Sequence, residues 1–203
     1  MSDAREGMVT TLDLTGPAGL RPFVVKGLAD SGRTVLVVAA TAREAEDLVV
    51  VLGDLLDPTT VAYYPAWETL PHERLSPRSD TVGQRLAVLR RIKHPGTHPA
   101  NGPLQVVVAP IRSVLQPQVS GLADLVPVEL AVGDRAELED VVRRLADAAY
   151  SRVDLVEKRG EFAVRGGIVD VFPPTGEHPL RVEFFGDEVD EIRTFAVADQ
   201  RTL

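Results

Sequence analysis

The sequence predicts an α/β fold, with a partial parallel-sheet domain followed by a smaller α+β domain that has an antiparallel sheet. Two continuous apolar runs, 33–40 and 105–109, are typical of strands buried on both faces of a parallel sheet. Helical patterns alternate with such strands over the first 115 residues, as in α/β proteins. From residue 159 onward, alternating side chains and glycine turns indicate paired antiparallel strands instead.

Each element of the first domain follows from a local pattern. Thr41 suits the N-cap of a helix, and Glu44 three positions later completes a capping box. Apolar residues at helical spacing continue this helix to Leu52. The other elements expected, in chain order, are a strand or the lead into a helix at 10–14, a helix at 20–29, a strand at 61–64, a proline-rich extended loop at 65–80, a helix at 81–92 with Val82, Leu86, Leu89 and Ile92 inward, a loop at 94–103 and a short helix at 111–115.

The composition changes near residues 120–121, where we place a domain boundary. The two predicted domains are therefore 11–120 and 121–203. The second domain begins with a strand at 126–131 and a helix at about 136–149. Its sheet follows, with strands that include 161–165, 181–185 and 189–196, and Gly186-Asp187 forms the turn between the last two.

Alternation along 181–185 gives the second domain a sheet face of mixed chemistry. Arg181, Glu183 and Phe185 point to one side, away from the apolar residues between them, and Arg165 lies on the polar face of an earlier strand. Such a face favours a protein-docking patch, because aromatic residues and Arg carry most of the binding energy at interfaces. The alternative is that Phe185 covers a second core layer, and the pattern alone leaves both interpretations open.

Charge and composition restrict the partners. The net charge is −8, and residues 125–203 carry −7 of it, with 10 Lys/Arg against 17 Asp/Glu. Such a surface repels phosphate backbones, so we expect a protein partner with a basic or apolar surface. The absence of cysteine excludes disulfides and thiolate metal sites and fits a reducing cytoplasm. No apolar run is long enough to span a bilayer, so no membrane partner is expected.

No catalytic, cofactor-binding or metal-binding residues are predicted. The turn at Gly16 lacks the G-x-x-x-x-G-K-[ST] pattern of a phosphate-binding loop, because Arg21 and Pro22 stand where the second glycine and the lysine belong. The alternative function is residual nucleotide binding, or DNA binding through the basic residues of 74–93. Trp67 and Tyr64 could stack bases there, although an apolar anchor for the proline-rich loop is the expected role.

Several motifs resemble the bacterial transcription-repair coupling factors (Mfd) and, in part, the related excision-repair protein UvrB. The resemblance covers nearly the whole chain after the first ten residues. It rests on RGEFAVRGGIVDVFP at 159–173, RVEFFGDE at 181–188 and DQRT at 199–202, with WETLP at 67–71, LSP at 75–77 and GQRLAVLR at 83–90 favouring the coupling factors over UvrB.

This resemblance implies a UvrB-like first domain with a degenerate nucleotide loop. It also implies a second domain that binds the damage-recognition protein UvrA, with Arg165, Arg181, Glu183 and Phe185 as the binding residues. UvrB-like sequences have Arg-x-Arg-Gly at the first of these motifs, whereas Ala163 replaces the first arginine here. The chain is then expected to be an amino-terminal fragment whose α/β layer is incomplete.

The resemblance further implies that the full-length protein is a DNA translocase that uses ATP and magnesium and displaces stalled RNA polymerase. RNA polymerase and DNA would be bound by other domains of that protein. For the present chain we predict a non-catalytic, cytoplasmic recruitment module of transcription-coupled nucleotide excision repair, with UvrA as its partner and no cofactor of its own.

Overall fold

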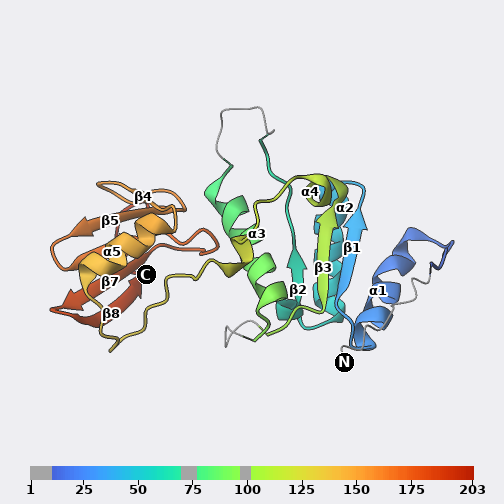
Figure 1. Cartoon of the computed structure of the whole chain (residues 1–203), viewed down its shortest axis with the longest axis horizontal. Coiled ribbons are helices and arrows are strands. Elements are labelled where there is room, and N and C mark those ends of the chain that lie inside the picture. Colours follow the sequence, from blue (N-terminus) through green and yellow to red (C-terminus); the bar gives the residue numbers. More distant parts are fainter. Residues whose placement is uncertain (1–10, 70–76, 97–101) are drawn as a thin grey trace, which may run out of the picture.

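The computed structural model describes residues 11–69, 77–96 and 102–203. It contains a three-stranded sheet in the first part of the chain and a five-stranded sheet in the second (Figure 1). The first sheet is parallel and flanked by helices, while the second is mostly antiparallel. The predicted fold class is therefore confirmed.

The first part places the middle strand, β3, between β1 and β2, and both pairings are parallel. Its elements are η1 (Ala18–Leu20), α1 (Arg21–Asp30), β1 (Val35–Ala39), α2 (Ala42–Leu55), η2 (Pro58–Thr60), β2 (Val61–Tyr63), α3 (Ser79–Lys93), β3 (Val106–Pro110) and α4 (Ile111–Leu115). The helices and strands expected between residues 20 and 115 are thus present. The predicted strand or helix lead is wrong for residues 11–14, which form neither, and Thr10 lies outside the described residues.

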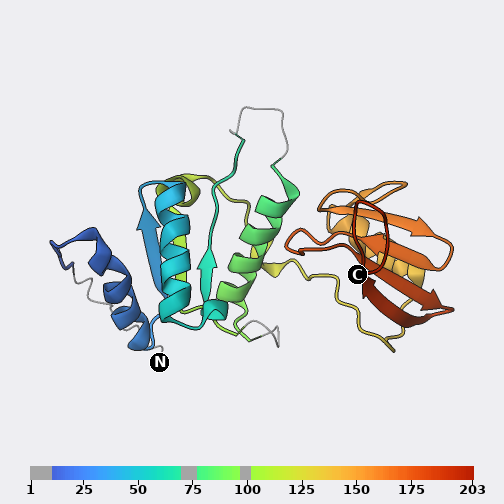
Figure 2. The same cartoon turned by 180° about the vertical axis from the view of Figure 1, so that it is seen from behind.

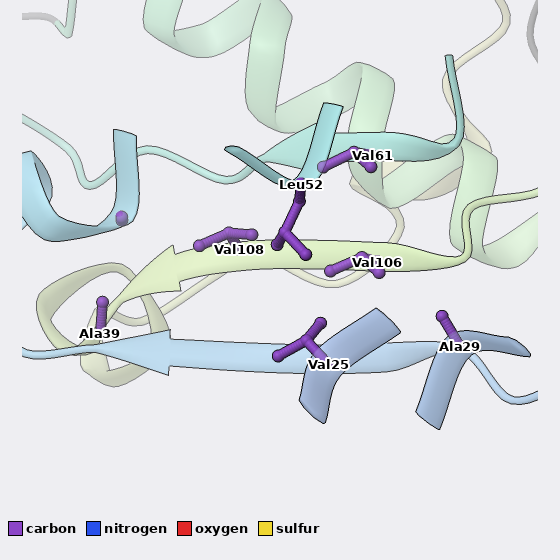
Figure 3. Close-up of a cluster of buried hydrophobic side chains, with 8 residues drawn as sticks. Val25, Ala29, Ala39, Leu52, Val61, Val106 and Val108 are labelled. Atoms are coloured by element: carbon purple, nitrogen blue, oxygen red, sulfur yellow. The ribbon is translucent and has the colours of Figure 1, made fainter. Parts of the chain in front are cut away.

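Helices α1 and α2 pack against one face of this sheet. Figure 3 shows Val25 and Ala29 of α1 and Leu52 of α2 directed at Val106 and Val108 of β3. On the other face, α3 packs over β2 and β3 through Val88, which joins a cluster with Tyr64, Leu104, Val107 and Ala109. The cap of α2 is also as predicted, since Thr41 Oγ1 accepts a hydrogen bond from the Glu44 N–H.

The expected burial on both faces is confirmed for β3 and wrong for β1. Every residue of β3 is buried. In β1, however, Leu36 and Val38 are 56% and 45% exposed. The reason is position, because β1 is an edge strand and α3 covers the sheet only over β2 and β3.

The inward face of α3 also differs from the prediction. The buried residues are Thr81, Arg85 and Val88. Of the residues predicted to point inward, Leu89 packs against the cluster that contains Val88, while Val82 and Leu86 are half-buried and Ile92 is 52% exposed. The apolar pattern placed the centre of the inward face incorrectly because it treated Arg85 as a solvent-facing side chain. Arg85 instead packs between aromatic rings of the preceding segment.

The second part builds its sheet in the order β4-β5-β6-β7-β8. β4 is parallel to β5, and the other pairings are antiparallel. Its elements are η3 (Leu122–Asp124), α5 (Leu138–Asp147), β4 (Ser151–Arg152), β5 (Glu161–Arg165), β6 (Ile168–Val171), β7 (Leu180–Phe185) and β8 (Glu188–Thr194). Helix α5 covers one face of the sheet and leaves the other face to loops (Figures 1 and 2). The core under α5 consists of Val141, Leu145, Phe162, Val169, Val182 and Val189.

The strand expected at 126–131 is absent from the structure. This segment is extended and packs Val128 and Leu130 against the α5 core without joining a ladder. Pro127 has no N–H to donate, which disfavours regular pairing. Pairing begins only at 133–136, where the Gly133 N–H donates to Val189 O at 2.8 Å.

The boundary at 120–121 stays a prediction. The structure adds that η3, just beyond it, packs on α3 and that Asp124 forms an ion pair with Lys93. The two parts also pack together at Gly83 of α3. A side chain at this position would overlap Pro174, because an added Cβ would lie 2.4 Å from the Pro174 side chain.

Candidate functional site

The four predicted binding residues lie on the face of the five-stranded sheet that α5 does not cover, which we call the outer face. Val182 and Phe184 of β7 pack into the core under α5. Alternation therefore places Arg181, Glu183 and Phe185 on the outer face.

Three of these residues gather at one end of the sheet. Across the strands, Arg165 is paired with Ile168, and Ile168 with Glu183. The β5–β6 and β7–β8 turns lie at this same end, because the Phe184 N–H donates to Gly167 O at 2.8 Å. Both turns use glycine at positive φ, 59° at Gly166 and 66° at Gly186, a conformation that other residues rarely adopt. We call this region the turn end.

Phe185 is exposed to 82% of its surface at the turn end. The alternative that it covers a second core layer is therefore wrong for this chain. That layer exists nearer the other end of the outer face, where Val156, Ala163, Phe172 and Phe195 form a buried cluster. Phe185 is left as a large exposed apolar side chain, with Glu188 opposite it on β8.

Arg181 is held within the domain rather than free on the outer face. Its Nε and Nη2 atoms donate to the two carboxylate oxygens of Asp170 at 2.7 and 2.9 Å. Asp170 is only 3% exposed, and the guanidinium carbon of Arg181 lies 4.8 Å from the ring centre of Phe195. The hydrogen bonds to Asp170 raise the pKa of Arg181. The bidentate pairing typical of arginine is therefore used internally.

Glu183 is also paired, with Arg193 of β8, and Arg193 Nε lies 3.2 Å from the Glu191 carboxylate. Both side chains of the Glu183–Arg193 pair remain about one third exposed. This network links the Glu183 carboxylate to β8. Glu183 thus presents a part-exposed negative charge near Phe185.

Arg165 is exposed, and its Nη2 donates to the backbone oxygen of Asp154 at 3.1 Å. It contributes to an open pocket of about 610 Å³ with Arg152, Val153, Asp154 and Val164. Sequence reasoning missed Arg152, Val153 and Asp154. No local pattern signals them, because β4 joins the edge of the sheet for only two residues.

The basic residues of 74–93, considered above as a DNA-binding alternative, are largely bound to the chain itself. Arg74 lies outside the described residues. The contacts of the others are an ion pair of Arg78 with Asp80, an ion pair of Lys93 with Asp124, a hydrogen bond from Arg90 to Leu125 O, and hydrogen bonds from Arg91 to Thr59 O and Gly102 O.

Arg85 shows this internal use most clearly. It is 1% exposed, and its guanidinium carbon lies 4.2 Å from the ring centres of both Tyr64 and Trp67. Nη1 donates to Pro65 O at 2.5 Å, and burial lowers the pKa of Arg85. Trp67 therefore anchors its loop as expected, but through a cation–π contact as well as apolar packing. The i, i+4, i+7 spacing of Thr81, Arg85 and Val88 was the signal that could have revealed this inward face.

The Gly16 turn, the other alternative site, precedes η1 and α1, with Pro22 buried in the first turn of α1. Arg21 forms an ion pair with Glu44. A depression of about 360 Å³ beside it carries Arg21 and Arg43 but also Glu44 and Asp47. Two acidic and two basic groups give it no net preference for a polyanion such as ATP.

Two further properties concern the described part of the chain. In it, no three His, Cys, Asp or Glu side chains come together so as to hold a metal ion. Nor does any of its helices combine the length and apolar character that crossing a membrane requires.

Comparison with known proteins identifies the family. Residues 128–203 match the model of the UvrB interaction domain, which covers the five-stranded sheet and α5. Over 197 residues, 97% of this chain, the sequence is 53% identical to the transcription-repair-coupling factor of Mycobacterium tuberculosis. Over the shared region, the chain belongs to the transcription-repair-coupling factor family.

More distant members of this family match as well. The transcription-repair-coupling factor of Bacillus subtilis is 31% identical over 206 residues, which cover 91% of this chain. That of Escherichia coli is 35% identical over 139 residues, or 68% of this chain. The chain spans 16% of the length of the Mycobacterium and Bacillus relatives and 11% of the Escherichia coli relative. The resemblance inferred from the motifs is confirmed.

Proposed function

We propose that this chain is a non-catalytic recruitment module of transcription-coupled nucleotide excision repair, which binds UvrA through the turn end of the outer face. The observation that carries this proposal is the exposure of Phe185, 82% of its surface, at the same end of the sheet as the exposed Arg165. An exposed aromatic ring and an arginine on one surface are the composition expected at the centre of a protein interface. The match of this domain to the UvrB interaction domain supports a partner from excision repair.

The four residues have two different roles in this proposal. Arg165 and Phe185 contact UvrA directly. Arg181 and Glu183 hold the surface in place through Asp170 and Arg193, and Glu183 adds a part-exposed charge at its border. The ATP-driven motor and the contacts with RNA polymerase and DNA belong, in this proposal, to parts of the coupling factor outside this chain.

Binding of purified UvrA to the immobilised chain tests the proposal, with biolayer interferometry as the readout. Phe185→Ala removes the exposed anchor and should weaken binding by about 2 kcal/mol, roughly thirtyfold. Arg165→Ala should weaken it at least about tenfold. Phe23→Ala is the matched control, because Phe23 is 58% exposed on α1, in the other part of the chain.

Thermal melting of each variant checks that the fold is intact, which is expected because Phe185 and Arg165 are exposed. The proposal predicts that UvrB competes for the same UvrA surface, since its domain resembles this one. Unchanged affinity of both variants, or no binding of UvrA by the unmodified chain, would reject the proposed surface.

A further inference from the structure

Helix α3 contacts the second part of the chain at two points near its amino-terminal end. At Gly83, an added Cβ would overlap the Pro174 side chain and lie 3.4 Å from Thr175 Cγ2. At Gly160, an added Cβ would lie 2.6 Å from Ser79 Oγ. Ser79 and Gly83 are four residues apart on α3, so both contacts lie on one side of the helix. The loop between β6 and β7 accordingly reaches α3 in both views (Figures 1 and 2).

Both glycines are required by the close approach of the two parts. Glycine weakens the interior of a helix relative to alanine, so Gly83 calls for a packing reason, and Pro174 supplies it. Gly160 is restricted twice, by Ser79 and by its own positive φ of 83°. By contrast, Gly27 of α1 has open space where its side chain would be. We call the contact formed by Ser79, Gly83, Gly160 and Pro174 the α3 latch.

The segments of the second part that touch α3 are joined to each other. The Gly160 N–H donates to Phe172 O at 2.8 Å. Arg159 Nε donates to Gly176 O at 3.0 Å, and the guanidinium carbon of Arg159 lies 5.2 Å from the ring centre of Phe172. The turn at 159–160 and the loop at 173–176 therefore move as one unit with the second sheet.

The α3 latch is not supported by a core that the two parts share. Each of the four buried apolar clusters of the described residues lies wholly within one part. An interface inside a chain that lacks a large apolar area resembles a transient protein–protein contact, for which relative motion of the two parts is expected.

The connection between the two parts is short and exposed. Arg90 of α3 donates to Leu125 O, which holds this end of the connection on the first part. Val128 packs into the core under α5, which belongs to the second part. Between them, Val126 and Pro127 are exposed and belong to no helix or strand. These two residues are therefore placed as a hinge.

We propose that the α3 latch holds in place a second part that otherwise swings about Val126 and Pro127. Gly160 precedes β5 and Pro174 follows β6, so the latch lies at the end of the sheet opposite the turn end. The closed latch directs the turn end away from α3, and opening it gives the turn end a variable direction relative to the first part. This inference goes beyond the proposed function and does not depend on UvrA binding.

Double electron–electron resonance between two spin labels tests the latch. The chain has no cysteine, so Asp54→Cys on α2 and Arg143→Cys on α5, both at exposed positions, can be labelled selectively. The labelled chain should give one narrow distance distribution. Gly83→Leu should make the distribution at least about twice as wide, because leucine does not fit beside Pro174. Gly27→Leu is the matched control, a helical glycine with open space around it, and should leave the distribution narrow.

Gly83→Ala separates opening of the latch from damage to the helix. Alanine favours a helix over glycine, so α3 itself should not be weakened, yet the added Cβ still overlaps Pro174. This variant should also broaden the distribution while circular dichroism shows an intact fold, and it decides the test if Gly83→Leu does not fold. A narrow distribution in every folded Gly83 variant would overturn the latch. So would a distribution that is already as broad in the chain with Gly83 as in Gly83→Leu.

Discussion

Arginines on α3 and arginines on the second sheet meet different environments. On α3, Arg85, Arg90 and Arg91 donate to carbonyl oxygens of other segments of the same chain. At the edge of the second sheet, Arg152 and Arg165 are exposed and form no ion pair within the described residues, although Arg165 also donates to a backbone oxygen, that of Asp154. The buried Arg85 stabilises the fold, whereas the exposed Arg165 belongs to the proposed binding surface. If that surface binds UvrA, a dense run of positive charge in the sequence is a poorer guide to binding than an exposed arginine in an acidic domain.

The largest effect on stability is expected from truncating Arg85. Arg85→Ala should lower the free energy of unfolding by about 3 kcal/mol, because it leaves a cavity between Tyr64 and Trp67 and an unpaired Pro65 oxygen. Urea denaturation followed by tryptophan fluorescence measures this, since Trp67 is the single tryptophan.

Arg85→Met is the matched variant for this prediction. It keeps most of the volume and also removes the buried Nε and Nη2 groups, which lack hydrogen-bond partners. Its cost should be less than half that of Arg85→Ala. A change below about 0.5 kcal/mol for Arg85→Ala would show that this arginine does not stabilise the first part of the chain.

A smaller effect is expected from replacing Asp170, whose carboxylate accepts two hydrogen bonds from Arg181. Asp170→Ala should destabilise the second part by about 2 kcal/mol, less than a fully buried pair, because the Arg181 side chain is 20% exposed. Differential scanning calorimetry measures the loss. UvrA affinity should fall only slightly at temperatures where the variant is folded, since Arg181 positions the surface without being its anchor. A loss of affinity as large as that of Phe185→Ala would instead make Arg181 a direct contact.

The smallest effect is expected from the exposed cations of α3. Lys93→Ala removes an ion pair with Asp124 in which both side chains are about half exposed, and should cost less than about 0.5 kcal/mol. UvrA affinity should not change, because this residue lies in the other part of the chain. A marked loss of UvrA or DNA binding in this variant would instead support a binding surface formed by residues 74–93.

The sequence was sufficient where one local signal dominated. The apolar run of β3 predicted full burial, and the alternation along β7 placed Phe184 and Phe185 on opposite faces, although it left open whether Phe185 is exposed. It failed where distant segments decide the outcome. The run of β1 could not show that α3 leaves Leu36 uncovered, because coverage depends on the position of another helix. The segment 126–131 has the composition of a strand, but in the structure it does not pair with another strand.

The candidate site was predictable in part for the same reason. Arg165, Glu183 and Phe185 could be assigned to one face by counting residues along strands. The pairing of Arg181 with Asp170 depends on the register between β6 and β7, which no local pattern fixes. The pocket beside Arg165 depends on where β4 leaves the sheet, and two residues of strand are too few to recognise in a sequence.

Amide hydrogen exchange of this chain with and without saturating UvrA tests the central claim most directly. The account predicts slower exchange at the two turns of the turn end, 165–168 and 184–188. Exchange in α3 should be unchanged, since its arginines are bound to the chain itself. Protection confined to α3, with both turns unaffected, would contradict the account.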